Sequence, residues 1–135
     1  MSAVLVIVKL LQTHQRLLGL VPADRVFSGT VLQQEQLPAI GVAEISRNEF
    51  ATVSRAEASS LIKARVQITV HAKDYRELKT VLLATKLGPG VHSGMIGGVK
   101  VRSVVRGDVG PDLSNDDASI YEQSRDFMVS YIEPN

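Results

Sequence analysis

The sequence has no cysteine, so disulfide bonds, thiolate zinc sites and cysteine nucleophiles are all excluded. Aromatic residues make up only 4% of the chain, which argues against a surface that stacks single-stranded bases on aromatic rings. The N-terminal apolar run, residues 3–8, ends at Lys9 and is far too short to span a bilayer. It also lacks a basic leader and a small-residue cleavage site, so no secretory signal and no membrane association are expected.

A global excess of positive charge is also missing, because the formal net charge is only +1. The charges are nevertheless unevenly distributed. Residues 63–106 contain nine Lys or Arg and two acids (+7), whereas residues 107–135 contain one Arg and seven acids (−6). This asymmetry suits a head-to-tail oligomer in which the basic patch of one subunit meets the acidic patch of its neighbour.

What the chain does contain is enough apolar sequence for one folded domain. Its 135 residues, 44% hydrophobic and 21% charged, have the composition of an ordinary soluble globular protein. This length accommodates one core and not two, so we expect a single domain over residues 1–135.

The clearest local pattern is the strict alternation of apolar and polar residues from Ile62 to Lys73. A period of two predicts a long strand with one buried and one exposed face, as in an antiparallel sheet. A helix follows without a linker, because Asp74 and Glu77 form a capping box and Gly88 provides the end.

Weaker patterns predict the other elements. Residues 2–18 place apolar side chains on one helical face, although their β-branched residues lower helix propensity. The last strand should point Tyr121, Phe127, Val129 and Tyr131 inward and Glu122, Ser124, Asp126 and Ser130 outward. Strands are expected near residues 25–27, 37–46, 99–107 and 120–133, a projecting hairpin or mobile loop at 46–61, a flexible connector at 92–98 and an acidic turn region at 108–119.

Together these patterns predict an α+β fold. We expect a two-layer sandwich with an antiparallel or mixed sheet of about four to five strands, two helices on one face and a protruding loop or hairpin.

No catalytic or metal site stands out. The three histidines, His14, His71 and His92, fall in different predicted elements, so none of them forms a ligand pair with another, and solvated or packed histidines are expected. The acidic residues at 108, 112, 116 and 117 could bind calcium, but their spacing does not match an EF-hand, and a solvated turn is the simpler interpretation.

The glycine-rich segment 88–98 invites a phosphate-loop interpretation. It lacks the required spacing, and it leads from a helix to a strand instead of from a strand to a helix. His92 beside Ser93 lacks the strained elbow and oriented base that a serine nucleophile needs. We therefore expect no enzyme and no cofactor, and we keep a small α/β ligand-binding or enzymatic domain that uses this segment as an alternative.

Basic residues of the central segment leave three interpretations open. They could form a nucleic-acid-binding module, they could pair with Glu122 and Asp126 across strands, or they could meet a neighbouring subunit. For the last case the candidate inter-subunit charge contacts are Lys63, Arg65, Lys73, Glu122 and Asp126. The nucleic-acid surface would also include Lys100, Arg102 and Arg106.

Four segments in a fixed order resemble the tail terminator family of long-tailed bacteriophages, also called tail completion or tail-to-head joining proteins. They are the N-terminal "VIVKLLQTHQRLLGLVP", the Pro-preceded strand "LPAIGVAEI", the strand and helix "RVQITVHAKDYRELKTVLLATKL", and the closing "IYEQSRDFMVSYIE" with its Ser-x-Asp-Phe pattern. They are distributed over nearly the whole chain, from residue 6 to residue 133, and each of them is a structural pattern, not a catalytic signature.

This resemblance implies a virion structural protein of the tail or neck, made in the cytoplasm of a bacterial host. It would form a homo-oligomer, a hexameric ring that caps the tail tube protein, ends its polymerisation and presents a surface to the head-completion or connector (stopper) protein. Genomic DNA would pass through the ring without specific binding.

The loop without an obvious core role supplies the candidate contacts to the tube, which are Arg47, Phe50, Val53 and Arg55. An exposed Phe50 in a polar loop is typical of a residue that anchors an interface. The alternative is that Phe50 folds back and fixes its own loop.

Overall fold

A curled, mixed sheet forms the body of the protein in a computed structural model that describes residues 2–29, 31, 36–50, 59–88, 92–115 and 119–134. In this part of the chain seven strands follow the order β1-β2-β3-β7-β5-β4, and β6 pairs beside β7. Among these described strands, only the pair β1 and β2 is parallel. The elements are α1 (Ser2–Thr13), α2 (Gln15–Leu18), a 3-10 turn (Ala23–Arg25), β1 (Val26–Ser28), β2 (Ala39–Phe50), β3 (Ser59–Ala72), α3 (Tyr75–Ala84), β4 (His92–Ile96), β5 (Val99–Val109), β6 (Leu113–Asn115) and β7 (Ile120–Pro134).

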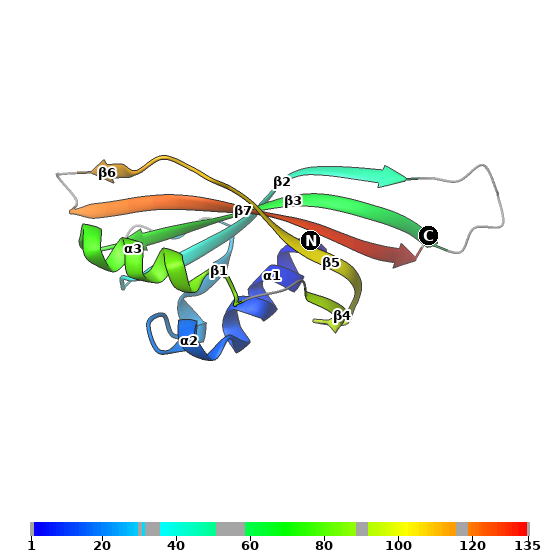
Figure 1. Cartoon of the computed structure of the whole chain (residues 1–135), viewed down its shortest axis with the longest axis horizontal. Helices are drawn as coiled ribbons and strands as arrows, with labels where there is room; N and C mark the ends of the chain where they lie inside the picture. Colours follow the sequence, from blue (N-terminus) through cyan, green and yellow to red (C-terminus); the bar gives the residue numbers. More distant parts are fainter. Residues whose placement is uncertain are drawn as a thin grey trace.

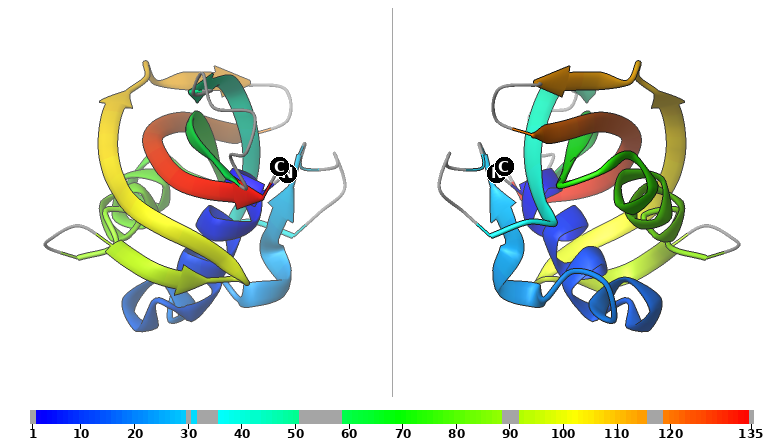
Figure 2. Two further views of the ribbon diagram at one scale, coloured as in Figure 1. Left: turned by 90° about the vertical axis from the view of Figure 1, so that its right-hand side faces the viewer. Right: turned by 90° about the vertical axis from the view of Figure 1, so that its left-hand side faces the viewer.

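The helices lie on one side of the sheet (Figure 1). Figure 2 shows that the sheet curls, so that β5 and β4 wrap around α1. The core forms between this concave face and the helices, from the buried stripe of β3, the inner face of β7 and the apolar sides of α1 and α3. Both predicted helices on one face and the α+β class are therefore present.

Strand β3 holds the centre and confirms the alternation seen in the sequence. Its buried residues recur at every second position, and it pairs along its whole length with β7 and along most of it with β2. Each apolar side chain of the stripe thus replaces water contacts with core contacts, which is the main favourable contribution to folding.

The predicted capping box at the start of α3 is present in part, because Asp74 caps the helix but Glu77 reaches back to Lys73 instead of Asp74. The Glu77 backbone N–H donates to Asp74 Oδ1 (2.8 Å), and the Lys73 backbone N–H donates to Glu77 Oε1 (3.2 Å). The helix ends at Ala84 and not at Gly88, because the chain turns into left-handed backbone at Leu87 (φ 62°) and Gly88 (φ 77°).

The predicted single helix over residues 2–18 is divided in two. His14 has extended backbone dihedrals (φ −81°, ψ 114°), so α1 ends at Thr13 and a short α2 starts at Gln15. The change of direction buries Leu17 completely.

The sheet has more strands than the four to five predicted, because two segments expected to be irregular are strands. The connector 92–98 contains β4, which forms a hairpin with β5 through Gly97 (φ 57°) and Gly98 (φ 79°). Positive φ at both turn residues is the requirement of a type I′ hairpin, and glycine meets it without strain. The acidic turn region contains β6, which adds three residues beside β7.

Strand β2 is also longer than predicted. It runs to Phe50 and pairs with β3 from Leu61 onward, so residues 46–50 and 59–61 of the expected loop are strand ends that project beyond the helices (Figure 1). The prediction of a projecting hairpin is thus met in its described part, and residues 51–58 lie outside the described residues.

Candidate interaction surfaces

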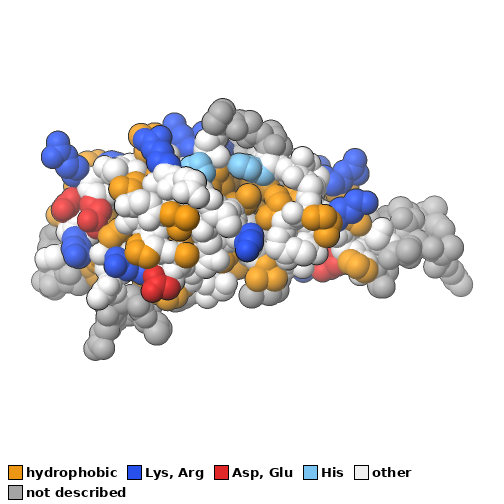
Figure 3. All heavy atoms as spheres, turned by 90° about the horizontal axis from the view of Figure 1, so that it is seen from below, with side chains coloured by type: hydrophobic (Ala, Val, Ile, Leu, Met, Phe, Trp, Pro, Cys, Tyr) orange, Lys and Arg blue, Asp and Glu red, His pale blue; other side chains and the backbone are white. Residues whose placement is uncertain are grey.

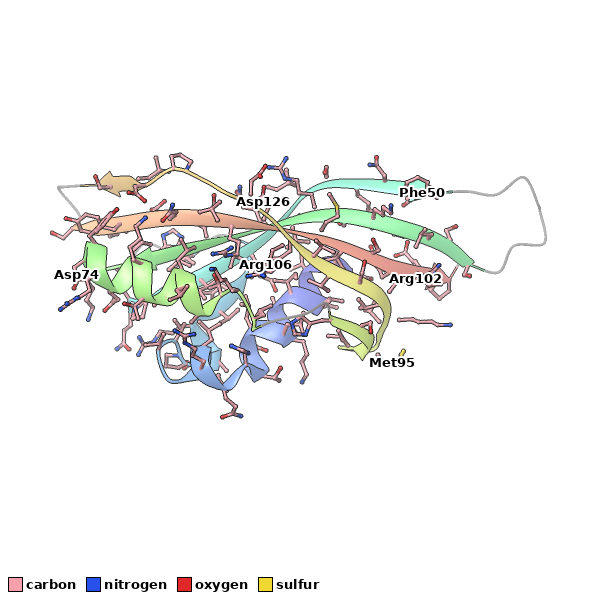
Figure 4. All side chains as sticks on the ribbon, in the orientation of Figure 1. Phe50, Asp74, Met95, Arg102, Arg106 and Asp126 are labelled. Atoms are coloured by element: carbon pink, nitrogen blue, oxygen red, sulfur yellow. The ribbon has the colours of Figure 1, made fainter. Side chains whose placement is uncertain are left out.

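Phe50 ends the described part of β2 on the projecting arm (Figure 4). Its side chain is 48% exposed, and Lys63 Nζ lies 5.6 Å from the ring centroid. A cation at this distance from an aromatic face gains on the order of 0.5–1 kcal/mol at an exposed site. Lys63 therefore covers one side of Phe50 only in part, and an apolar surface remains available.

Arg47, a second predicted contact residue, is held within its own subunit. Its guanidinium forms ion pairs with Glu133 on β7 (2.5 Å) and with Glu49 (3.2 Å). Among the described residues, Arg47 Nε and the Tyr131 hydroxyl are buried without a hydrogen-bond partner. Burial raises the pKa of the Tyr131 phenol above its ordinary value, and Arg47 partly opposes this shift. The other two predicted contacts, Val53 and Arg55, lie outside the described residues.

An ion pair crosses the outer face of the central strands. Arg65 on β3 donates from Nε to Asp126 Oδ2 on β7 (2.8 Å), and a second guanidinium nitrogen contacts the same oxygen. Gln67 donates to the other carboxylate oxygen (3.3 Å). The cross-strand alternative is thus realised for Arg65 and Asp126.

The prediction that the Asp126 side chain faces water is wrong. The residue lies on the outer face of the sheet but is only 6% exposed. The register between β5 and β7 shifts between Arg106 and Val109, and the bulge lays Gly107 over the aspartate. A Cβ built on Gly107 would lie 3.2 Å from the Asp126 Cβ. The carboxylate is therefore enclosed by Arg65, Gln67 and the backbone of β5.

The remaining predicted charge contacts differ in their partners. Glu122 lies 3.2 Å from His71 Nδ1 on the neighbouring strand. Lys63 and Lys73 are exposed and form no ion pair within the described part of the chain. A contact of these five residues with a neighbouring subunit stays a prediction.

An acidic and apolar strip, the 108–113 segment, follows the bulge of β5. Asp108 is exposed, as are the apolar side chains of Val109 and Leu113. Asp112 accepts from Lys79 Nζ (2.5 Å) and from the Tyr75 hydroxyl (2.9 Å), and these hydrogen bonds hold its pKa below the usual range. Asp116 and Asp117 lie outside the described residues.

A basic hollow of about 410 Å³ opens at the other end of α3, between α3, α2 and β5. The described residues that line it include no carboxylate. Figure 3 shows this helix-bearing underside, on which histidine side chains lie among hydrophobic and basic ones. The lining residues are His14, Arg16, Leu83, Ala84, Lys86, Gly88 and Arg106.

Arg125 is a buried cation close to this hollow. It donates from Nε to Thr85 Oγ1 (3.2 Å) and from a terminal nitrogen to the Leu82 carbonyl (3.4 Å), so it caps the last turn of α3. No carboxylate pairs with it among the described residues. Burial lowers the pKa of Arg125, and the positive charge of Arg106 lowers it further.

Sequence reasoning did not identify the basic hollow. Arg16 and Lys86 lie near helix ends far apart in the chain, and only the packing of α2 against α3 brings them together. The inward position of Arg125 is visible in the sequence, because this residue falls on the buried side of the β7 alternation.

The histidines stay apart, as their sequence positions predict. His14 lines the basic hollow, His71 lies beside Glu122 on the outer face, and His92 Nε2 lies 3.2 Å from the Leu87 carbonyl oxygen. The described residues contain no group of three or more His, Asp or Glu side chains placed to hold a metal ion. Within the same residues, every helix is too short or too polar to span a bilayer.

Comparison with known proteins gives a likeness in fold alone. The chain matches no family model and none of the curated proteins. Among solved structures, it is similar to a chain of the "virion of native gene transfer agent (GTA) particle", with a TM-score of 0.60 and 11% sequence identity. The match covers 95% of this chain and 92% of the other, so the two share one fold from end to end.

Proposed function

We propose that this protein is a virion structural protein of a phage-like particle, which caps the tail tube, ends tube polymerisation and forms the interface to the head connector. The observation that carries the proposal is the end-to-end likeness in fold to a chain of a gene transfer agent virion. The resemblance of the sequence to tail terminators supports the same role, and it extends the role to a closed, hexameric ring.

The sheet provides a physical route to self-assembly. Strand β1 pairs with β2 only at Ile40, Gly41 and Val42, so among the described strands nothing pairs with the outer edge of β2 from Ala43 to Phe50. Open edges accept strands or loops of another chain. The bulge near Ile45 and the charges of Glu44 and Glu49 restrict such pairing to a complementary partner, which suits a contact that closes into a ring.

In this proposed role the protein carries out no chemical reaction. Its charged pairs each have a structural role in the fold, such as Arg65 with Asp126 across two strands and Lys79 with Asp112 beside β6. Its function then depends on contact surfaces that the sheet holds at fixed geometry, without a cofactor.

A tube-assembly experiment tests the proposal. Purified tail tube protein from the same particle is polymerised with and without this protein, and tube lengths are measured by electron microscopy. We expect shorter tubes that bear a cap at one end. Tubes of unchanged length without caps, at concentrations where the protein is folded, would contradict the proposal.

The basic hollow favours a second candidate, a nucleic-acid-binding module. Such a module loses affinity steeply as salt increases, because binding releases counterions from the phosphates. A short DNA duplex bound at low salt and released at moderate salt would support it, and no binding at either concentration would exclude it.

A further inference from the structure

The cations of the basic hollow have no counter-charge in the described part of their own subunit. Arg16, Lys86 and Arg106 are exposed, and none of them forms an ion pair with a described residue. Arg125 adds a fourth positive charge close to Arg106. Like charges gathered in one place repel, so the hollow favours a ligand that brings carboxylates or phosphates.

The hollow is also partly apolar, which distinguishes between these ligands. Leu83 is 47% exposed and lines the hollow together with Ala84. A phosphodiester backbone offers no apolar partner for such a wall, whereas a peptide that carries both acidic and apolar side chains does.

This chain itself presents such a peptide. In the 108–113 segment, Asp108 is exposed next to Val109, and Leu113 is 56% exposed. Exposed apolar side chains beside an exposed acid offer a partner both apolar and charged contacts. The segment therefore complements the hollow in charge and in apolar character.

The two surfaces lie at different ends of α3, because Asp112 of the segment contacts Tyr75 and Lys79, whereas the hollow lies at the last turn of the helix. β6, at the end of the segment, lies on the side of the sheet away from α2, which borders the hollow (Figures 1 and 2). Because these contacts and the pairing of β6 with β7 hold the segment at the first turns of α3, the hollow at the last turn is open to the segment of a second copy. A contact between unlike surfaces repeats head to tail around a ring.

We propose that the 108–113 segment of one subunit docks in the basic hollow of the next, with Asp108 facing Arg16 and Lys86 and with Leu113 or Val109 against Leu83. This inference rests on the proposed function, since it names the subunit contact of the assembly. This contact brings the basic central region of one subunit and the acidic C-terminal region of its neighbour into one interface.

Charge reversal tests the contact. Arg16→Glu/Lys86→Glu should weaken self-association at least tenfold in light scattering, while the melting temperature of the dilute subunit stays within a few degrees of the wild type. The matched control, Lys9→Glu/Arg76→Glu, reverses two exposed cations elsewhere and changes the net charge equally. This control should associate like the wild type.

A mixing experiment gives the sharper result. Asp108→Lys alone should also fail to associate. Mixed in equal amounts with Arg16→Glu/Lys86→Glu, it should restore assembly, because subunits can alternate so that the reversed segment of one variant meets the reversed hollow of the other. Mixing either Asp108→Lys or Arg16→Glu/Lys86→Glu with the control variant should not incorporate it into assemblies to the extent seen when the two are mixed with each other.

The outcomes separate this inference from the proposed function. A wild type that never associates, even with tail tube protein, overturns both. A wild type that assembles together with an unaffected Arg16→Glu/Lys86→Glu variant overturns only the docking of the segment in the hollow. A hollow variant that associates normally and loses DNA binding also overturns this docking, and assigns the hollow to nucleic acid.

Discussion

Arg65 on β3 encloses Asp126 on β7 across the centre of the sheet, with Nε 2.8 Å from Oδ2, under the bulge formed by β5. Removing one member of such an enclosed pair leaves the other without its hydrogen bonds, which costs more than the pair contributes as a whole. These two residues of opposite charge therefore have a structural role within one subunit.

Asp126→Ala should therefore destabilise the isolated subunit by about 1–3 kcal/mol in urea unfolding. Glu122→Ala is the control on the same strand face, and it should cost less than about 1 kcal/mol because the Glu122 side chain is more exposed (37%) than that of Asp126 (9%). Equal costs for the two variants, or a loss of assembly with unchanged unfolding, would show that Asp126 acts between subunits.

The turn between β4 and β5 requires glycine for its backbone and not for space. Gly98 has φ 79°, and a Cβ added there would meet no atom of the described chain within 4 Å. Gly98→Ala should therefore cost about 1 kcal/mol or slightly more through left-handed strain alone. Gly19→Ala is the matched comparison, since Gly19 has φ −68°. That change should be neutral or stabilise by about 0.4–1 kcal/mol in the same thermal unfolding assay.

The pair of Lys79 and Asp112 makes stability depend on pH. The pKa of Asp112 is lower in the folded state than in the unfolded chain, so its contribution is fully present above the unfolded value and is lost as pH falls through the folded value. The melting temperature of Asp112→Asn should lie below that of the wild type at neutral pH, and the difference should vanish in strong acid.

Asp108→Asn serves as the control for this titration, because no ion pair holds Asp108 within the described part of the chain. At neutral pH its melting temperature in the dilute subunit should equal that of the wild type. A difference for Asp112→Asn that persists unchanged in acid would attribute the effect to something other than the carboxylate charge.

Substitution of Phe50 tests between two roles of this side chain, an anchor of an interface or a contact that fixes its own loop. If it anchors the contact to the tube, Phe50→Ala should weaken capping of tail tubes at least tenfold and change the unfolding free energy by less than about 1 kcal/mol. Met95→Ala removes an even more exposed apolar side chain elsewhere and should leave capping intact. Loss of stability without loss of capping would favour the self-contained role.

The sequence patterns that predicted the structure correctly are those formed by residues of a single helix or strand. The alternation of β3 and the N-cap at Asp74 depend on neighbours in the chain, and both are present in the structure. Strand β4 was missed because Gly94, Gly97 and Gly98 suggest a flexible connector until the hairpin register is known. The far end of β2 was missed because its residues are mostly polar, so no alternation marks them.

The candidate surfaces depend on contacts that the linear sequence does not contain. Asp126 is buried because β5 bulges over it, and the basic hollow exists because α2 packs near the end of α3. Charge counting did indicate an opposed basic middle and acidic end. It could not indicate which of these charges pair within the subunit, as Arg65 does, and which find no ion-pair partner among the described residues, as is the case for Arg106.

Imaging the wild-type protein tests the central claim most directly, namely that the fold exists to present contact surfaces for a closed assembly. Negative-stain electron microscopy, with tail tube protein added if the free subunit is monomeric, should show closed rings of uniform size with six subunits and a central hole. Dispersed monomers that remain single in the presence of tubes, or open filaments in place of rings, would contradict the account.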